Sequence, residues 1–395
     1  MWLTHRNRRC VELDARVFER LLTFYPEEDL LGRPVLSEAI IRGEIKKSDL
    51  IAEADKHFIP WQMFLLSWAN LGKHLRRIEK ERLDKIQVGE LSKRAGAKGP
   101  PPYRLIDRCI RAQNFLVGLG AYKANPFNGA LRGKTIEEAL RVVERHFAID
   151  RPTFWGKSRK EDALEYLIAR FESGQVNVAL GTSEPRLVPS TSNHRRLYKS
   201  ISGFCLKSPK VPFAFVHMNM AGEEEPAGRR IYTLVLLIAH IGLGIYTVSR
   251  DWRPGRTRER GADYSRMAHS IASAFLLPSE AVDRYRSRTI TPEVVKEIGD
   301  FYKLTPTAAI YRLWKDKVIT REEMDALRTP FVPKKTQARS PRIENAVRKL
   351  NGGLVVSAVN GAYAARRITQ NQAQYVLFGR VTRKLWRQYR ERVGL

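Results

Sequence analysis

Cysteine is scarce in this chain, which has three cysteines among 395 residues. Cys10, Cys109 and Cys205 are odd in number and far apart in the sequence. They therefore form neither a disulfide framework nor a Cys-x-x-Cys zinc motif. This usage is typical of a reducing compartment, and we expect the protein to be cytoplasmic.

Long apolar runs are also missing. The strongest one, Ile231–Tyr246, contains His240 and is shorter than the ~20 residues that cross a bilayer. The basic residues that follow Met1 do not lead into an apolar segment, which argues against a secretory signal. We therefore expect a buried helix at this run and no membrane partner.

Acidic residues are few relative to basic ones. The chain has 70 Lys and Arg against 42 Asp and Glu, a formal net charge of +28. Such a charge repels itself, and an acidic partner relieves the repulsion, which makes nucleic acid the expected partner. The alternative is a basic protein without such a partner, because net charge governs association and not fold. The 43% hydrophobic content excludes a disordered chain.

The order of predicted elements indicates an α+β fold that is mostly helical. We expect a helical N-terminal module at 1–95, closed by a linker of Gly and Pro at 95–102, and a helical connector at 103–160. In the connector, Thr135 and Glu138 have the spacing of a capping box. A module at 161–328 combines helices with three short strands rich in Val and Phe, at 175–181, 202–206 and 212–219.

A second Pro-containing linker, 328–341, leads into a basic helical C-terminal module at 340–395. From Phe331 to Leu395 there are fourteen Lys or Arg and two acidic residues. If 377–390 is one helix, an apolar arc and a basic arc lie on opposite sides of it. The basic arc, which we expect to contact phosphates, consists of Arg380, Arg383, Lys384, Arg387 and Arg390. An ordinary solvated face is the alternative.

One segment of the 161–328 module has a recognisable pattern. It reads Arg229-Arg-Ile-Tyr-Thr-Leu-Val-Leu-Leu-Ile-Ala-His240 and is followed by a helix that ends Ala272-Ser-Ala-Phe-Leu-Leu-Pro278. Together they resemble the ImmA/IrrE family of zinc metallopeptidases, in which the first segment carries His-Glu-x-x-His. The resemblance covers 162 to about 327 and implies a zincin-like module.

Position by position, the resemblance fails where catalysis needs it. The family's first histidine falls on Leu236, its catalytic glutamate on Leu237 and its second histidine on His240; the third ligand falls on Ser265 or, in another alignment, Met267. Leucine can neither bind zinc nor polarise a metal-bound water. We therefore expect no catalytic residues and no cofactor.

His240 admits two interpretations. The first is a core histidine that is hydrogen-bonded within the fold. The alternative is a remodelled zinc site formed by His240 and His269, with His217 or Asp263 as a third ligand. Gly242 and Gly244 lack the third glycine of a nucleotide-binding loop and indicate close packing of the helix.

The N-terminal segment Arg42–Trp61 is similar to the second half of the helix-turn-helix domains that often precede this peptidase module. A helical packing module is the alternative there.

The first hypothesis is thus a catalytically inactive metallopeptidase-like protein with a regulatory or interaction role. It would associate with nucleic acid or with a protein partner, in a mobile-element, phage or stress-response system, as the family resemblance implies. The second hypothesis is an active zinc metalloendopeptidase with rearranged ligands that cleaves a DNA-bound repressor. The third is a structural subunit of a larger assembly.

Overall fold

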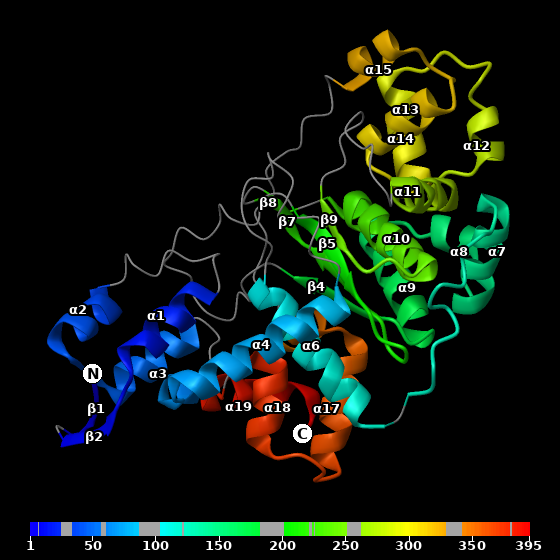
Figure 1. Ribbon diagram of the computed structural model, residues 1–395. Helices are drawn as coiled ribbons and strands as arrows, with labels where there is room; N and C mark the ends of the chain where they lie inside the picture. The colour runs from blue at the N-terminus through cyan, green and yellow to red at the C-terminus, as the bar shows by residue number, and fades with distance from the viewer. Residues whose placement is uncertain are drawn as a thin grey trace.

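The computed structural model describes residues 1–6, 8–24, 34–56, 61–86, 103–120, 122–181, 201–220, 223–224, 226–250, 262–328, 342–379 and 381–395. Helices dominate this part of the chain and the strands form small sheets, so the fold is α+β (Figure 1). The expected linker 95–102 and nearly all of the linker 328–341 lie outside the described residues.

The N-terminal region contains a three-stranded sheet. Its strands are β1 (Trp2–His5), β2 (Arg8–Glu12) and β3 (Glu44–Lys46), in the order β2-β1-β3. The prediction of a helical module at 1–95 did not include this sheet. The strands have at most five residues, and β2 is exposed throughout, so no buried alternation marks it in the sequence.

Helices complete this region and bury its own apolar core, which includes Leu3, Phe18, Leu21 and Leu50. The helices are α1 (Ala15–Phe24), α2 (Pro34–Arg42), α3 (Lys47–Lys56), the 3-10 turn η1 (Trp61–Leu65) and α4 (Trp68–Lys85).

A four-stranded sheet forms the centre of the molecule. Its order is β4-β6-β5-β9, with β4 (Asn177–Gly181) parallel to β6 (Phe213–His217), and β5 (Ile201–Leu206) antiparallel to both β6 and β9 (Val248–Arg250). The first three strands match the predicted ones, whereas β9 was not predicted. A separate short pair, β7 (Asn219–Met220) and β8 (Glu223–Glu224), lies beyond β6.

Helices cover one face of this sheet with residues from the middle of the chain. Val178, Cys205 and Val216 point into a core with α7 (Ile136–Phe147), α9 (Lys160–Ser173), α10 (Ala227–Leu243) and α11 (Ala262–Leu276). The short α8 (Arg151–Trp155) and α12 (Ser279–Asp283), and the helices α13 (Pro292–Phe301), α14 (Pro306–Lys315) and α15 (Arg321–Arg328), extend this layer. The predicted capping box of α7 is confirmed, because Glu138 N lies 3.2 Å from Thr135 Oγ1.

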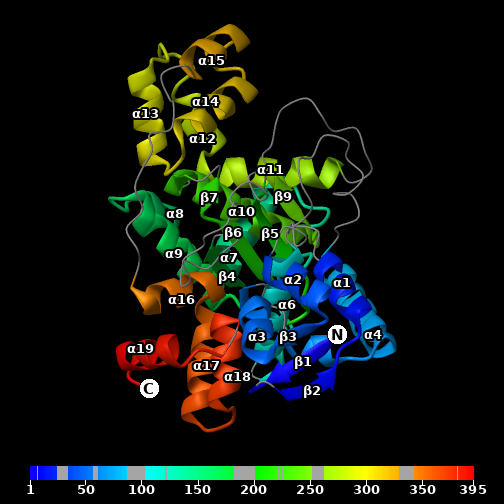
Figure 2. The same ribbon diagram turned by 90° about the vertical axis from the view of Figure 1, so that its left-hand side faces the viewer.

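The opposite face is covered by α6 (Tyr103–Gly118) and by the C-terminal helices α16 (Ile343–Asn351), α17 (Gly353–Ala364), α18 (Gln370–Phe378) and α19 (Arg383–Val393) (Figure 2). Phe204, Phe213 and Phe215 of the sheet share a core with these helices. Buried polar contacts fix the arrangement, since the Asn177 side-chain amide donates to the Asn351 carbonyl at 2.9 Å. The C-terminal helices therefore complete the layer around the sheet.

Candidate functional site

Helix α10 carries the positions that the family resemblance assigns to the metal ligands. It is buried along nearly its whole length, as expected for a helix that is apolar on all sides. It packs against α11 and against the strands β5 and β6. It ends at Gly244, whose φ of +69° is the left-handed conformation that favours glycine at a helix C-terminus.

The two leucines of α10 lie in the apolar interior. Leu236 is 3% exposed and Leu237 is fully buried, and both belong to the core between α10 and its neighbours. Neither position offers a donor atom. His240, one turn after Leu236, is also buried.

The interior favours the neutral form of His240. Burial, followed by the nearby charge of His269, lowers the pKa of His240 to about 3. Among the described residues, its Nδ1 atom has no hydrogen-bond partner. The expected hydrogen bond of a core histidine is thus missing at this atom.

His269 on α11 is the polar neighbour of α10. Its Nδ1 lies 2.9 Å from the hydroxyl oxygen of Tyr232, which is two turns before His240 on α10. Burial and, to a lesser extent, the charge of Lys315 lower the pKa of His269 to about 4. The packing of α10 on α11 therefore brings His269 close enough to His240 to lower the pKa of His240.

These residues do not fit a zinc ion. A catalytic zinc takes three protein ligands, and within the described ranges no three His, Cys, Asp or Glu side chains are grouped to hold a metal. Ser265 is exposed to solvent, and the side chain of Asp263 lies outside the described residues. The neighbouring charge on α14 is positive: Lys315 lies near His269, and its ammonium donates to Ser270 Oγ at 3.2 Å. A bound cation would be repelled by it.

The sequence had not singled out Tyr232 or Lys315 as neighbours of His269. The position of Tyr232, eight residues before His240, places both on one face of the helix, so its spacing contained this signal. The contribution of Lys315 depends on how α14 packs, which the sequence does not show.

The C-terminal basic residues that the structure describes lie on a shorter helix than the predicted one. A single helix over 377–390 was wrong, because Gly379, with φ +74°, ends α18 and a separate helix, α19, begins at Arg383. Val381, which lies on the apolar arc of the predicted helix, is 51% exposed. Tyr389, which belongs to the same predicted arc, is buried as expected, and together with Trp386 it anchors α19 in the core.

Three of the predicted phosphate-contacting residues, Arg383, Lys384 and Arg387, are exposed on α19. Arg390 is partly buried. Its Nε donates to the Leu395 carbonyl oxygen at 3.0 Å, so this side chain makes a contact within the protein. Arg380 lies outside the described residues.

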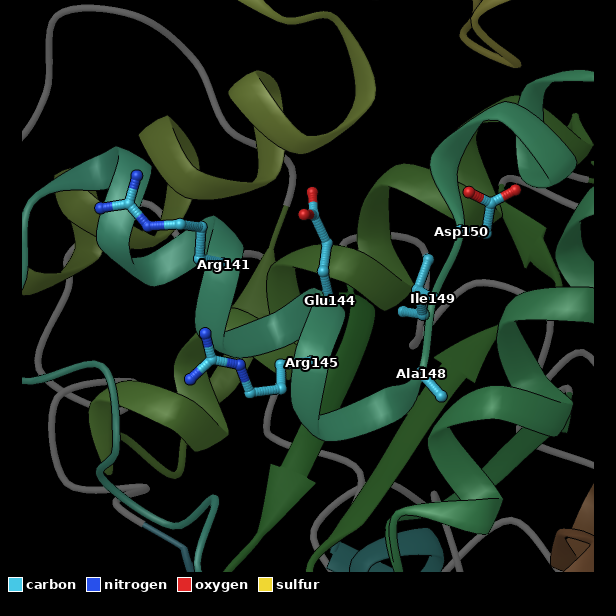
Figure 3. A pocket seen from close by; sticks show the side chains of 6 residues that line it. All are labelled: Arg141, Glu144, Arg145, Ala148, Ile149 and Asp150. Carbon is cyan, nitrogen blue, oxygen red and sulfur yellow. The ribbon is translucent and has the colours of Figure 1, made fainter.

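A shallow pocket of about 390 Å³ lies between the end of α7 and the start of α8 (Figure 3). Its lining comprises Arg141, Glu144, Arg145, Ala148, Ile149 and Asp150. Both carboxylates are already engaged: Glu144 pairs with Arg151 at 2.6 Å, and Asp150 accepts from the Thr153 backbone at 2.8 Å. A second pocket, of about 420 Å³, lies between the end of α17 and the last residues of the chain. Neither contains a pair of groups suited to catalysis.

Comparison with protein-family models, with curated proteins and with solved structures gives no match for this chain. The helices of the described residues are each too short or too polar to cross a membrane.

Proposed function

We propose that the protein is a catalytically inactive relative of the ImmA/IrrE metallopeptidases, with a zincin-like module, that acts as a regulatory or interaction protein and binds nucleic acid. The observation that carries the first part is the burial of Leu236 and Leu237 at the positions of a metal-binding histidine and a catalytic glutamate. Restoring polar groups there would require burying them in an apolar core, which costs several kcal/mol without partners.

The binding of nucleic acid is supported by charge. The net charge of +28 favours an acidic partner, and α19 presents Arg383, Lys384 and Arg387 to solvent. On the side of α19 that faces the core, Trp386 and Tyr389 are buried. A rigidly anchored helix with an exposed basic side is suited to bind phosphates, because arginine can donate two hydrogen bonds to one phosphate.

The family resemblance implies a role in a mobile-element, phage or stress-response system in the cytoplasm. In such a role the zincin-like module serves as a scaffold, and recognition of nucleic acid or of a protein on it is the activity.

Fluorescence anisotropy with labelled DNA duplexes of unrelated sequence tests the nucleic-acid part. Each phosphate contact releases counterions, so three contacts on α19 predict that log K falls against log salt with a slope of about −3 or steeper. Absence of binding at low salt, or a slope near zero, would contradict the proposal and favour a structural subunit whose basic surface faces an acidic protein.

A second function would require a metal ion between two histidines of the interior. His240 and His269 lie on facing helices and interact electrostatically. If a metal ion joined them to a third donor, the protein would be a metallopeptidase with rearranged ligands, acting on a DNA-bound repressor. The positive charge of Lys315 beside His269 opposes this alternative.

A further inference from the structure

The N-terminal sheet has one face in the core and an outer face whose charged side chains are exposed, although Thr4 in the middle of that face is only 9% exposed. Leu3 of β1 is opposite Ile45 of β3, and both are buried in the core of this region. Residues directly opposite each other in neighbouring strands share a face, and successive residues alternate between the faces. Trp2 and Thr4 of β1 therefore belong to the other face.

The pairing register arranges charge on this outer face in two rows. In the order β2-β1-β3, the row near the β1–β2 turn is Arg9–Thr4–Lys46 and the row at the other end of the sheet is Glu12–Trp2–Glu44. A register shift between Leu3 and Thr4 brings Arg9 and Glu12, which are three residues apart on β2, to the same face. One row is basic and the other is acidic. The Arg9 guanidinium lies 5.7 Å from the centre of the Trp2 ring, which places Arg9 on the same face as Trp2.

The basic row is accessible. Arg9 and Lys46 are both exposed, and β2 is exposed at all five positions, so the edge of the sheet stands clear of the core. The turn adds His5, Arg6 and Arg8, which are also exposed. Arg6 has φ +50°, a left-handed conformation that is uncommon for arginine.

We propose that the end of this sheet that carries Arg9 and Lys46 binds the phosphates of duplex DNA, as a second contact surface beside α19. The inference rests on the proposed nucleic-acid binding and adds where a second part of the duplex is held. Arg9 and Lys46 are two strands apart, or about 10 Å, which is comparable with the ~12 Å width of the major groove. They are thus spaced to contact phosphates on its two sides.

The strand register also determines how the sheet is oriented on a nucleic acid and which kind of duplex it fits. Glu12 and Glu44 repel phosphates at the far end of the same face, so the sheet approaches the duplex with its turn first. The major groove of DNA admits a ribbon of strands, whereas the major groove of A-form RNA is deep and narrow. Duplex DNA is therefore the partner that this surface fits, and duplex RNA is expected to bind it more weakly.

The test compares full-length variants that have the same net charge. Arg9→Glu/Lys46→Glu changes the sheet, and Lys296→Glu/Arg321→Glu makes the same change at exposed positions of α13 and α15. In both views these helices lie at the opposite end of the molecule from β1 and β2 (Figures 1 and 2). Anisotropy with a DNA duplex should show that the sheet variant binds at least about 10-fold more weakly than the control variant. Its salt slope should be smaller by about 2, for two lost phosphate contacts.

A variant that is expected to bind DNA more tightly completes the test. Tighter binding, unlike a loss of binding, cannot result from misfolding of the variant. Glu12→Lys/Glu44→Lys should strengthen binding of DNA and leave the far-UV circular dichroism unchanged. If the wild type binds DNA but the sheet variant matches its control, or if duplex RNA binds equally well, this inference is wrong and the proposed function stands. If the wild type binds no duplex at low salt, the proposed function itself fails.

Discussion

Arg82 of α4 and Asp107 of α6 form a two-pronged ion pair inside the protein, with N–O distances of 2.9 and 2.8 Å. The side chains are 8% and 4% exposed. The guanidinium of Arg82 also lies 4.2 Å from the centre of the Tyr103 ring. This pair connects the N-terminal region to the helix that covers the central sheet.

Asp107→Asn should therefore be strongly destabilising, because it removes the carboxylate that forms the two-pronged pair with the buried charge of Arg82. We expect a loss of about 3–5 kcal/mol in the free energy of unfolding, measured by denaturant titration. The matched control is Asp162→Asn, which breaks the exposed pair with Arg159 and should cost less than about 1 kcal/mol. Equal effects of the two substitutions would show that the interior pair does not hold the regions together.

The two interior histidines predict loss of stability in acid. The pKa values of His240 and His269 are lowered from 6.5 to about 3 and about 4, so between pH 6.5 and about 4 the unfolded chain binds more protons than the folded one. Their contribution is complete above pH 6.5 and falls as the pH decreases, by up to about 1.4 kcal/mol per pH unit for each histidine.

Denaturant titrations from pH 7 to pH 4 measure the slope of the free energy of unfolding against pH. His240→Leu should reduce it by the contribution of one proton. An unchanged slope in His240→Leu would mean that His240 is protonated within the fold.

The exposed side of α19 predicts a graded loss of DNA binding. Arg383→Glu/Lys384→Glu/Arg387→Glu should reduce the salt slope by about 3 and weaken binding at low salt, because three phosphate contacts are lost. The control with the same net charge is Lys296→Glu/Arg321→Glu/Arg328→Glu. Equal loss in both variants would indicate a response to total charge and no specific surface.

Gly242 of α10 predicts a packing defect. A Cβ atom at this position would lie 2.5 Å from Leu131 Cδ1 and 2.9 Å from Phe127 Cζ, which is closer than non-bonded atoms approach. Gly242→Ala should therefore destabilise the protein by about 1–3 kcal/mol. Gly361→Ala, where nothing lies within 4 Å of the added atom, is the control and should be neutral or slightly stabilising. A thermal melt of both variants decides this, and similar melting temperatures would contradict the packing.

The sequence predicted those features whose signal is local. The capping box of Thr135 needs only the spacing to Glu138, and the burial of α10 follows from its apolar composition. Features that depend on distant residues were missed. The strand β9 is three residues long and becomes a strand only by pairing with β5.

At the candidate site, too, local features could be read from the sequence directly, as the spacing of Leu236 and His240 on one helix shows. The proximity of His269 to His240 was anticipated only through the family resemblance, because it depends on the packing of α11 on α10. The break at Gly379 was overlooked because the apolar residues on either side of it continue a helical period. Glycine in the left-handed conformation ends the helix there nonetheless.

The central claim is that aliphatic side chains have replaced the metal ligands of the site on α10. Metal analysis of the purified protein by mass spectrometry, after exposure to zinc and removal of unbound ion, tests it most directly. The account predicts no stoichiometric zinc, and the same trace content in wild type and in His240→Ala/His269→Ala. One zinc ion per chain that is lost in this double variant would contradict it.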